Sequence, residues 1–146
     1  MIVRALADEE LEHVDARLPL HRLEQSGGLY LVAWEAGEPV GHAHLALTDP
    51  PELQDVYVLP AHRRRGVATA LTRAAEQEAA SRSFDRLTLS VDVENDAAQA
   101  LYRRCGYRER GGPVRHRGST LLRGEPFAFD VLLVYLVKPL GSPPGA

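Results

Sequence analysis

The sequence has very little cysteine, and this excludes several classes of protein. Cys105 is the only cysteine in 146 residues, so no intrachain disulfide can form and no thiolate-rich metal site can be assembled. No apolar run is long enough to cross a bilayer, and the N-terminus lacks the long apolar stretch of a signal peptide. We therefore expect a cytoplasmic protein that neither enters a membrane nor needs a metal.

An excess of positive charge is also missing. The chain has 17 Lys and Arg against 20 Asp and Glu, a formal net charge of -3. Proteins whose main partner is nucleic acid usually carry a basic surface, so we do not expect that partner here. The length fits one domain over residues 1–140, followed by a flexible, Gly- and Pro-rich tail at residues 141–146.

Strand-like patterns come first along the chain and later alternate with helix-like patterns. Six apolar or alternating segments predict strands, at residues 2–6, 29–35, 40–47, 52–58, 87–93 and 131–137. A further short strand is predicted to begin at Tyr107. Residues 36–39 predict the turn of an antiparallel hairpin, whereas the polar, Gly-rich residues 111–127 predict a connection. This order favours a mixed α/β sheet with helices on both faces.

Three helices are predicted from their caps and apolar stripes. The first begins at Asp8 as N-cap and is interrupted by Pro19. The second covers residues 66–81. The third is capped by Asn95 or Asp96 and ends at Gly106, because glycine tolerates a left-handed backbone.

The junction between the strand at residues 52–58 and the next helix carries the strongest chemical signal. Arg63, Arg64 and Arg65 precede Gly66 at the start of the helix. The first amides of a helix have no partner within it, and the helix dipole adds about half a positive charge there, so a pyrophosphate fits this position. Gly66 lets a phosphate approach the backbone. The other interpretation is a solvated turn rich in arginine.

Two common phosphate-binding motifs are absent from this junction. The sequence contains no Gly-Lys-Ser or Gly-Lys-Thr, and the Gly-x-Gly-x-x-Gly fingerprint of dinucleotide-binding domains is missing. Another kind of nucleotide-binding domain remains an open alternative, which a side-by-side titration with ATP and coenzyme A would separate.

The motif Arg63-x-x-Gly66-x-Ala68 after a strand, followed by Asn95 and Tyr102, resembles the GNAT superfamily of N-acetyltransferases. The resemblance implies a mixed, mostly antiparallel sheet with a splayed central strand pair and helices on both faces. It implies acetyl-CoA as cosubstrate and direct transfer of the acetyl group to a primary amine of a small molecule or peptide. The alternative is a non-catalytic acetyl-CoA-binding sensor or interaction module.

The resemblance also assigns roles to individual residues. It implies that a proton for the departing thiolate comes from Tyr102, that Asn95 contacts the cofactor, and that the amide of Val58 stabilises the oxyanion. The alternative, purely structural roles are an N-cap for Asn95 and a core aromatic for Tyr102. The full set of implied cofactor-binding residues is Val56, Tyr57, Val58, Arg63, Arg64, Arg65, Gly66, Val67, Ala68, Thr69, Asn95 and Tyr102.

An amine acceptor must lose a proton before it attacks, so a base or water chain is required. Some family members place a Glu where Ser90 stands here, so that assignment does not transfer. We rank Asp55 and Glu52 first as candidate bases, ahead of Asp92, and each is also a plausible pocket wall.

Two histidines are predicted to line the acceptor pocket. His42 and His44 alternate onto one face of their strand, together with Val40 and Ala46. A metal site there would need a third ligand that the neighbouring sequence does not show. The apolar final strand is compatible with a homodimer.

Overall fold

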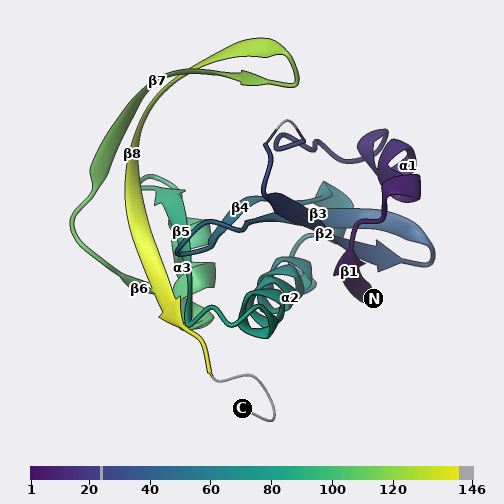
Figure 1. Cartoon of the computed structure of the whole chain (residues 1–146), viewed down its shortest axis with the longest axis horizontal. Coiled ribbons are helices and arrows are strands. Elements are labelled where there is room, and N and C mark those ends of the chain that lie inside the picture. Colours follow the sequence, from purple (N-terminus) through teal and green to yellow (C-terminus); the bar gives the residue numbers. More distant parts are fainter. Residues whose placement is uncertain (24, 142–146) are drawn as a thin grey trace.

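The computed structural model describes residues 1–23 and 25–141. The strands are β1 (Ile2–Ala5), β2 (Gly28–Glu35), β3 (Glu38–Ala46), β4 (Glu52–Val58), β5 (Arg86–Asp92), β6 (Arg108–Glu109), β7 (Val114–Leu122) and β8 (Glu125–Pro139). The helices are α1 (Leu11–Asp15), α2 (Val67–Ser81) and α3 (Asp96–Arg104), with 3-10 turns η1 (Asp8–Glu10) and η2 (Pro60–His62). The strands form one curled sheet in the order β1-β2-β3-β4-β5-β8-β6, and β7 pairs with β8 (Figure 1).

The sheet opens between its two central strands, β4 and β5. Their parallel pairing is registered at Glu52 and Thr88, whereas the other strand pairs of the sheet are antiparallel. The amide and Oγ1 of Thr88 both donate to the Pro51 carbonyl, at 3.0 and 2.8 Å, which fixes this end of the pair. The mostly antiparallel sheet with a splayed central pair is therefore confirmed.

A bulge in β4 accompanies the opening. His42 and His44 of β3 pair with Tyr57 and Gln54, so two residues of β4 stand opposite a single residue of β3. Asp55 is one of the two and has a φ of 49°. An extra residue in one strand bends that strand and strengthens its twist, so the bulge turns the end of β4 away from β5.

Helices cover both faces of the sheet, as predicted (Figure 1). Leu31 of β2 belongs to the core formed with α2 and α3, which includes Leu71 and Tyr102. The next residue, Val32, belongs to a second core that includes Val14 of α1. Successive strand residues point to opposite faces, so α1 lies on the face opposite α2 and α3. Each of these buried aliphatic side chains contributes about 1.5–3 kcal/mol to folding.

The β2–β3 hairpin forms with a tighter turn than predicted. Ala36 and Gly37 make the turn alone, with φ values of 49° and 81°. Ala33 pairs with Gly41 and Trp34 with Pro39, so Val40 is an extra residue that packs in the core on the α2 face. The prediction that Val40 shares a face with the two histidines of β3 is wrong, because this bulge shifts the alternation.

The segment after β6 differs most from the prediction. Residues 111–127 were expected to form a connection, but they contain β7 and the start of a longer β8. Arg123 and Gly124 make the turn between them, with φ values of 57° and 79°. The pattern was hidden because β7 is polar and largely exposed. The expected central place of the final strand is confirmed, since β8 lies between β5 and β6.

We call residues 114–133 the arm. It curves away from the sheet and its tip returns toward the segment that follows α1 (Figure 1). Arg123 at the tip donates to both carboxylate oxygens of Asp15, at 2.5 and 2.8 Å, and to the Leu20 carbonyl at 3.2 Å. The arm therefore arches over the end of the sheet where β4 and β5 begin to part.

The start of the chain is only partly as predicted. Asp8 lies inside η1 rather than at its N-cap, which is Ala7. The Glu10 carboxylate accepts from the Ala7 amide at 3.1 Å and pairs with Arg4. The following helix, α1, ends at Asp15, well before Pro19. The predicted flexible tail lies, apart from Gly141, outside the described residues.

Candidate active site

The turn between β4 and α2 offers a row of free backbone amides. Arg64 and Gly66 both have left-handed backbones, with φ values of 63° and 81°, and Gly66 is the N-cap of α2. The first backbone bond of the helix runs from the Ala70 amide to the Gly66 carbonyl. Within the described chain the amides of residues 64–69 donate to no backbone carbonyl. Such a row at a helix N-terminus attracts phosphate oxygens.

The open edge of β4 places the Val58 amide next to this turn. The Leu59 amide donates to the Val40 carbonyl of β3 at 2.9 Å. Because successive residues of a strand direct their backbone groups to opposite edges, the Val58 amide and carbonyl face the opening toward β5. The Nε of Arg63 donates to that carbonyl at 2.9 Å. One backbone donor and a charged side chain therefore meet at the opening.

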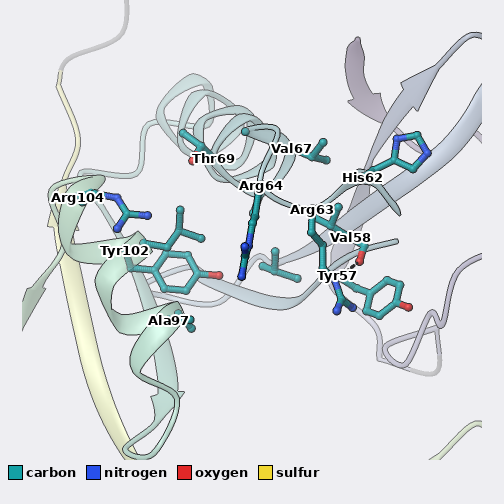
Figure 2. A pocket seen from close by; sticks show the side chains of 15 residues that line it. Tyr57, Val58, His62, Arg63, Arg64, Val67, Thr69, Ala97, Tyr102 and Arg104 are labelled. Atoms are coloured by element: carbon teal, nitrogen blue, oxygen red, sulfur yellow. Dashed lines mark hydrogen bonds between the residues drawn. The ribbon is translucent and has the colours of Figure 1, made fainter. Parts of the chain in front are cut away.

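A cavity of about 580 Å³ lies between β4, the start of α2 and one side of α3. In Figure 2 the side chains of Arg64 and Tyr102 converge near its middle, whereas Arg63 points toward Tyr57 and Val58. The cavity is lined by Val56, Tyr57, Val58, His62, Arg63, Arg64, Gly66, Val67, Ala68, Thr69, Ala97, Ala98, Leu101, Tyr102 and Arg104. Ten of the twelve predicted cofactor-binding residues are thus brought together, which leaves out Arg65 and Asn95.

Those two residues lie elsewhere. Arg65 is exposed and does not line the cavity. The Oδ1 of Asn95 accepts from the Ala98 amide at 3.1 Å, so the predicted N-cap of α3 is confirmed. Asn95 lines the neighbouring cavity instead. Its contact with a cofactor remains a prediction.

Tyr102 stands between two cavities. Its side chain is 7% exposed, and burial raises the pKa of its hydroxyl to about 12. The phenol therefore keeps its proton at neutral pH. Tyr102 lines the cavity beside α2 and also a smaller cavity of about 260 Å³ beside β4 and β5. Val56 and Ala98 are shared in the same way, so the two cavities meet at this tyrosine.

We call the smaller space the acceptor-side cavity. Three carboxylates line it: Glu52 and Asp55 from β4, and Asp92 from β5. Ser90 of β5 lies on the same wall. Negative charge thus gathers on one side of Tyr102, while the free amides of the α2 turn lie on the other.

Asp55 is held by several donors. Its Oδ2 accepts from the Tyr30 hydroxyl at 2.5 Å and from the His21 amide at 3.0 Å, and the His21 ring lies 3.3 Å from Oδ1. The Tyr30 oxygen in turn accepts from the Arg22 amide at 2.7 Å. Burial and this bond to Asp55 raise the pKa of Tyr30. Asp55 therefore fixes residues 21–22 against the sheet.

His42 and His44 pack beneath this carboxylate. The Tyr30 ring meets both imidazoles edge-on, at centroid distances of 5.3 and 4.9 Å. His42 is fully buried, with Nδ1 3.9 Å from an Asp55 oxygen, and burial lowers the pKa of its ring. Neither histidine lines the acceptor-side cavity. Their place beside an acceptor stays a prediction. Their rings pack against Tyr30, which holds Asp55 in the wall of the acceptor-side cavity.

Glu52 is more loosely held than Asp55. One of its oxygens accepts from the Gln54 side-chain amide at 3.1 Å, and the Gln54 carbonyl oxygen pairs with Nδ1 of His44 at 3.1 Å. Burial lowers the pKa of His44, so the ring is neutral and donates through Nδ1. This chain of hydrogen bonds orients Glu52 and leaves its second oxygen without a hydrogen bond to a described residue.

Sequence reasoning missed two residues of this site, Arg22 and Tyr30. Both depend on contacts between segments far apart in the chain, and neither carries a local motif. Among the described residues, no three His, Cys, Asp or Glu side chains gather closely enough to hold a metal ion. None of the helices in this part of the chain is long and apolar enough to span a membrane.

The site combines a row of free amides, which suits phosphate oxygens, with an open strand edge and a second, acidic cavity. The model of the acetyltransferase (GNAT) family matches residues 2–107. The chain therefore belongs to the GNAT family of acetyltransferases, and the resemblance predicted from its motifs is confirmed.

Named relatives agree with this assignment. Aminoglycoside N(6')-acetyltransferase type 1 of Acinetobacter haemolyticus is 42% identical over 57 residues, which are 39% of each chain. The uncharacterized N-acetyltransferase YhfO of Bacillus subtilis is 32% identical over 102 residues, covering 65% of this chain and 68% of that one. The chain thus aligns with well under half of the aminoglycoside enzyme.

Solved structures share the fold. The ribosomal-protein-S18-alanine N-acetyltransferase from Escherichia coli has a TM-score of 0.71 at 19% identity, covering 99% of this chain and 97% of that one. Nourseothricin acetyltransferase has a TM-score of 0.72 at 18% identity, covering 96% and 98%. At such identities the likeness establishes the arrangement of strands and helices.

Proposed function

We propose that the protein transfers the acetyl group of acetyl-CoA to a primary amine of a small molecule or peptide, by direct attack in a ternary complex. The observation that carries this proposal is the row of free amides at residues 64–69 beside the open edge of β4. The amides would receive the pyrophosphate, and the edge would bind the amides of the pantetheine arm as a neighbouring strand does.

Val58 would stabilise the charge that develops on the thioester oxygen. Its amide faces the opening, is fixed by the strand and needs no reorganisation during the reaction. A preorganised donor of this kind is typically worth about 3 kcal/mol in the transition state. Arg63, which binds the Val58 carbonyl at 2.9 Å, would hold that peptide unit in place.

Two side chains would handle protons. Tyr102 would donate to the departing thiolate, since its pKa of about 12 keeps it protonated. Glu52 would accept the proton of the incoming ammonium, directly or through water, because one of its oxygens is free of the Gln54 bond. Asp55 lines the same cavity but already accepts two hydrogen bonds, so we assign it the positioning of the wall.

The cell context is also a proposal. We infer a cytoplasmic enzyme with acetyl-CoA and an amine as its partners, and without nucleic acid, membrane or metal in its reaction. The homodimer suggested by the apolar final strand stays a prediction. The competing function is a non-catalytic acetyl-CoA sensor. The buried, protonated Tyr102, which lines both cavities, argues against it, because a sensor needs no proton donor.

The test is release of CoA thiol from acetyl-CoA in the presence of a broad panel of amines and peptides, together with calorimetry of acetyl-CoA binding. We expect both saturable binding and amine-dependent thiol release. Binding with no release across the panel would favour the sensor and contradict the enzyme.

A further inference from the structure

The inner face of the arm forms one wall of a third cavity, of about 430 Å³. Alternate residues of β8 point inward, among them Phe127, Phe129 and Leu133. The Tyr135 hydroxyl lies 2.6 Å from Nε2 of His116, which closes the wall between β8 and β7. A continuous apolar and aromatic surface therefore faces the space beneath the arm.

This cavity continues into the acceptor-side cavity. Arg22, Glu52 and Ser90 line both. A molecule seated at Glu52 therefore has the arm's aromatic surface on one side and Tyr102 on the other. The combined space is of a size for one small acceptor.

Arg22 is the unusual residue on this shared wall. Its Nε is buried and has no hydrogen-bond partner, and its guanidinium forms no ion pair with any described residue. Glu52 lines the same cavities but bonds to Gln54, and Asp55 is bonded by Tyr30 and His21. Arg22 as a whole is half-buried, and leaving its buried Nε without a partner is costly. A carboxylate that reaches this guanidinium forms a strong, charge-assisted hydrogen bond.

The position of Arg22 is set by the site itself. Its backbone amide donates to the Tyr30 hydroxyl at 2.7 Å, and that hydroxyl donates to Asp55. The same network therefore holds the acidic wall and the arginine at once. A polycation would place an ammonium against Arg22, which disfavours acceptors with several positive charges.

We propose that the acceptor is an α-amino acid with an apolar or aromatic side chain. This rests on the proposed function and names its substrate class. The ammonium would face Glu52, the carboxylate would face Arg22, and the side chain would lie on Phe127 and Phe129. In the reaction Glu52 takes one proton of the ammonium, and the free amine nitrogen bonds to the acetyl carbon as the carbon–sulfur bond breaks. The thiolate gains a proton from Tyr102, and the second proton that the nitrogen loses as the amide forms restores the phenol through water. The products are an N-acetyl amino acid and CoA, and Glu52 releases its proton to solvent.

The experiment compares matched acceptors in the CoA-release assay: phenylalanine, phenylalaninamide, phenethylamine, alanine and spermidine. We expect phenylalanine to have the highest kcat/KM. Arg22→Gln should lower kcat/KM for phenylalanine on the order of 10- to 100-fold, mainly through KM, while phenethylamine changes less than about 3-fold. Arg22→Lys should restore part of the loss.

A second readout does not depend on turnover. Calorimetry of N-acetylphenylalanine binding to the CoA complex should show the same loss in Arg22→Gln, and Arg17→Gln, which removes an exposed arginine paired with Glu38, should change neither readout. Preference for phenethylamine or spermidine, or equal losses for all amines in Arg22→Gln, would overturn the substrate class alone. Absence of turnover with every amine would overturn the proposed function as well.

Discussion

Tyr102 shows how the surroundings of one residue prepare it for chemistry. It is 7% exposed, packs edge-on against Tyr107 at a centroid distance of 5.9 Å, and lines both cavities. Burial raises its pKa to about 12, so the phenol loses its proton only as the pH rises toward that value. A proton donor is therefore present throughout the neutral range.

Tyr102→Phe should lower kcat by about 100-fold or more, since general acid catalysis typically contributes that much. Binding of acetyl-CoA should change little, and so should the melting temperature, because the phenol forms no hydrogen bond with the described residues. Steady-state kinetics and thermal unfolding check this. Tyr57→Phe is the matched control: it removes the hydroxyl of a second tyrosine among the lining residues but keeps the main chain of β4. Full activity in Tyr102→Phe would remove its assigned role.

At the scale of elements, the turn into α2 is the part that local sequence determines best. Gly66 has a φ of 81°, and a Cβ built there would meet no atom within 4 Å. The space in front of it belongs to the cavity where the pyrophosphate is proposed to lie. The substitution Gly66→Ala therefore tests two effects, backbone strain and loss of room for the ligand.

We expect Gly66→Ala to cost roughly 1–2 kcal/mol of folding stability through its left-handed backbone, and to weaken acetyl-CoA binding by about 10-fold or more through the added Cβ. Gly37→Ala is the matched control, because Gly37 has the same φ of 81° and equally open surroundings in the β2–β3 turn. Chemical denaturation should show similar stability losses. Equal acetyl-CoA affinity in the two variants would contradict the ligand position.

Elements governed by local pattern could be predicted, and those governed by distant contacts could not. The strand ending at Val58, the α2 entry at Gly66 and the Asn95 cap each have a nearby signal. The β7 strand has none, because its outer face is solvated and its turn lacks the usual asparagine or aspartate. The bulge at Val40 and the placing of Arg22 by Tyr30 depend on register between strands and on tertiary hydrogen bonds.

At the scale of the whole molecule, the arm joins the last part of the chain to the first. Arg123 reaches Asp15 across 108 residues of sequence and closes an arch over the third cavity, which adjoins the acceptor-side cavity. The pair is partly exposed, so its contribution to stability is about 1 kcal/mol or less. The larger effect of this ion pair is to hold the aromatic face of the arm in position over the third cavity.

Asp15→Asn should therefore raise KM for the acceptor several-fold and leave acetyl-CoA affinity unchanged. Kinetics at saturating acetyl-CoA measure the first effect and calorimetry the second. Glu38→Gln is a suitable control, since Glu38 also binds an arginine on the surface but lies at the start of β3 and forms no ion pair with the arm among the described residues. An unchanged acceptor KM, or a shared loss in both variants, would mean that the arm does not shape the acceptor site.

The most direct test of the central claim is calorimetry with acetyl-CoA and ATP side by side. If the free amides of residues 64–69 seat a pyrophosphate and the open edge of β4 binds the pantetheine arm, acetyl-CoA should bind at one saturable site and far more tightly than ATP, which lacks that arm. Equal or tighter binding of ATP, or no heat with acetyl-CoA, would contradict it.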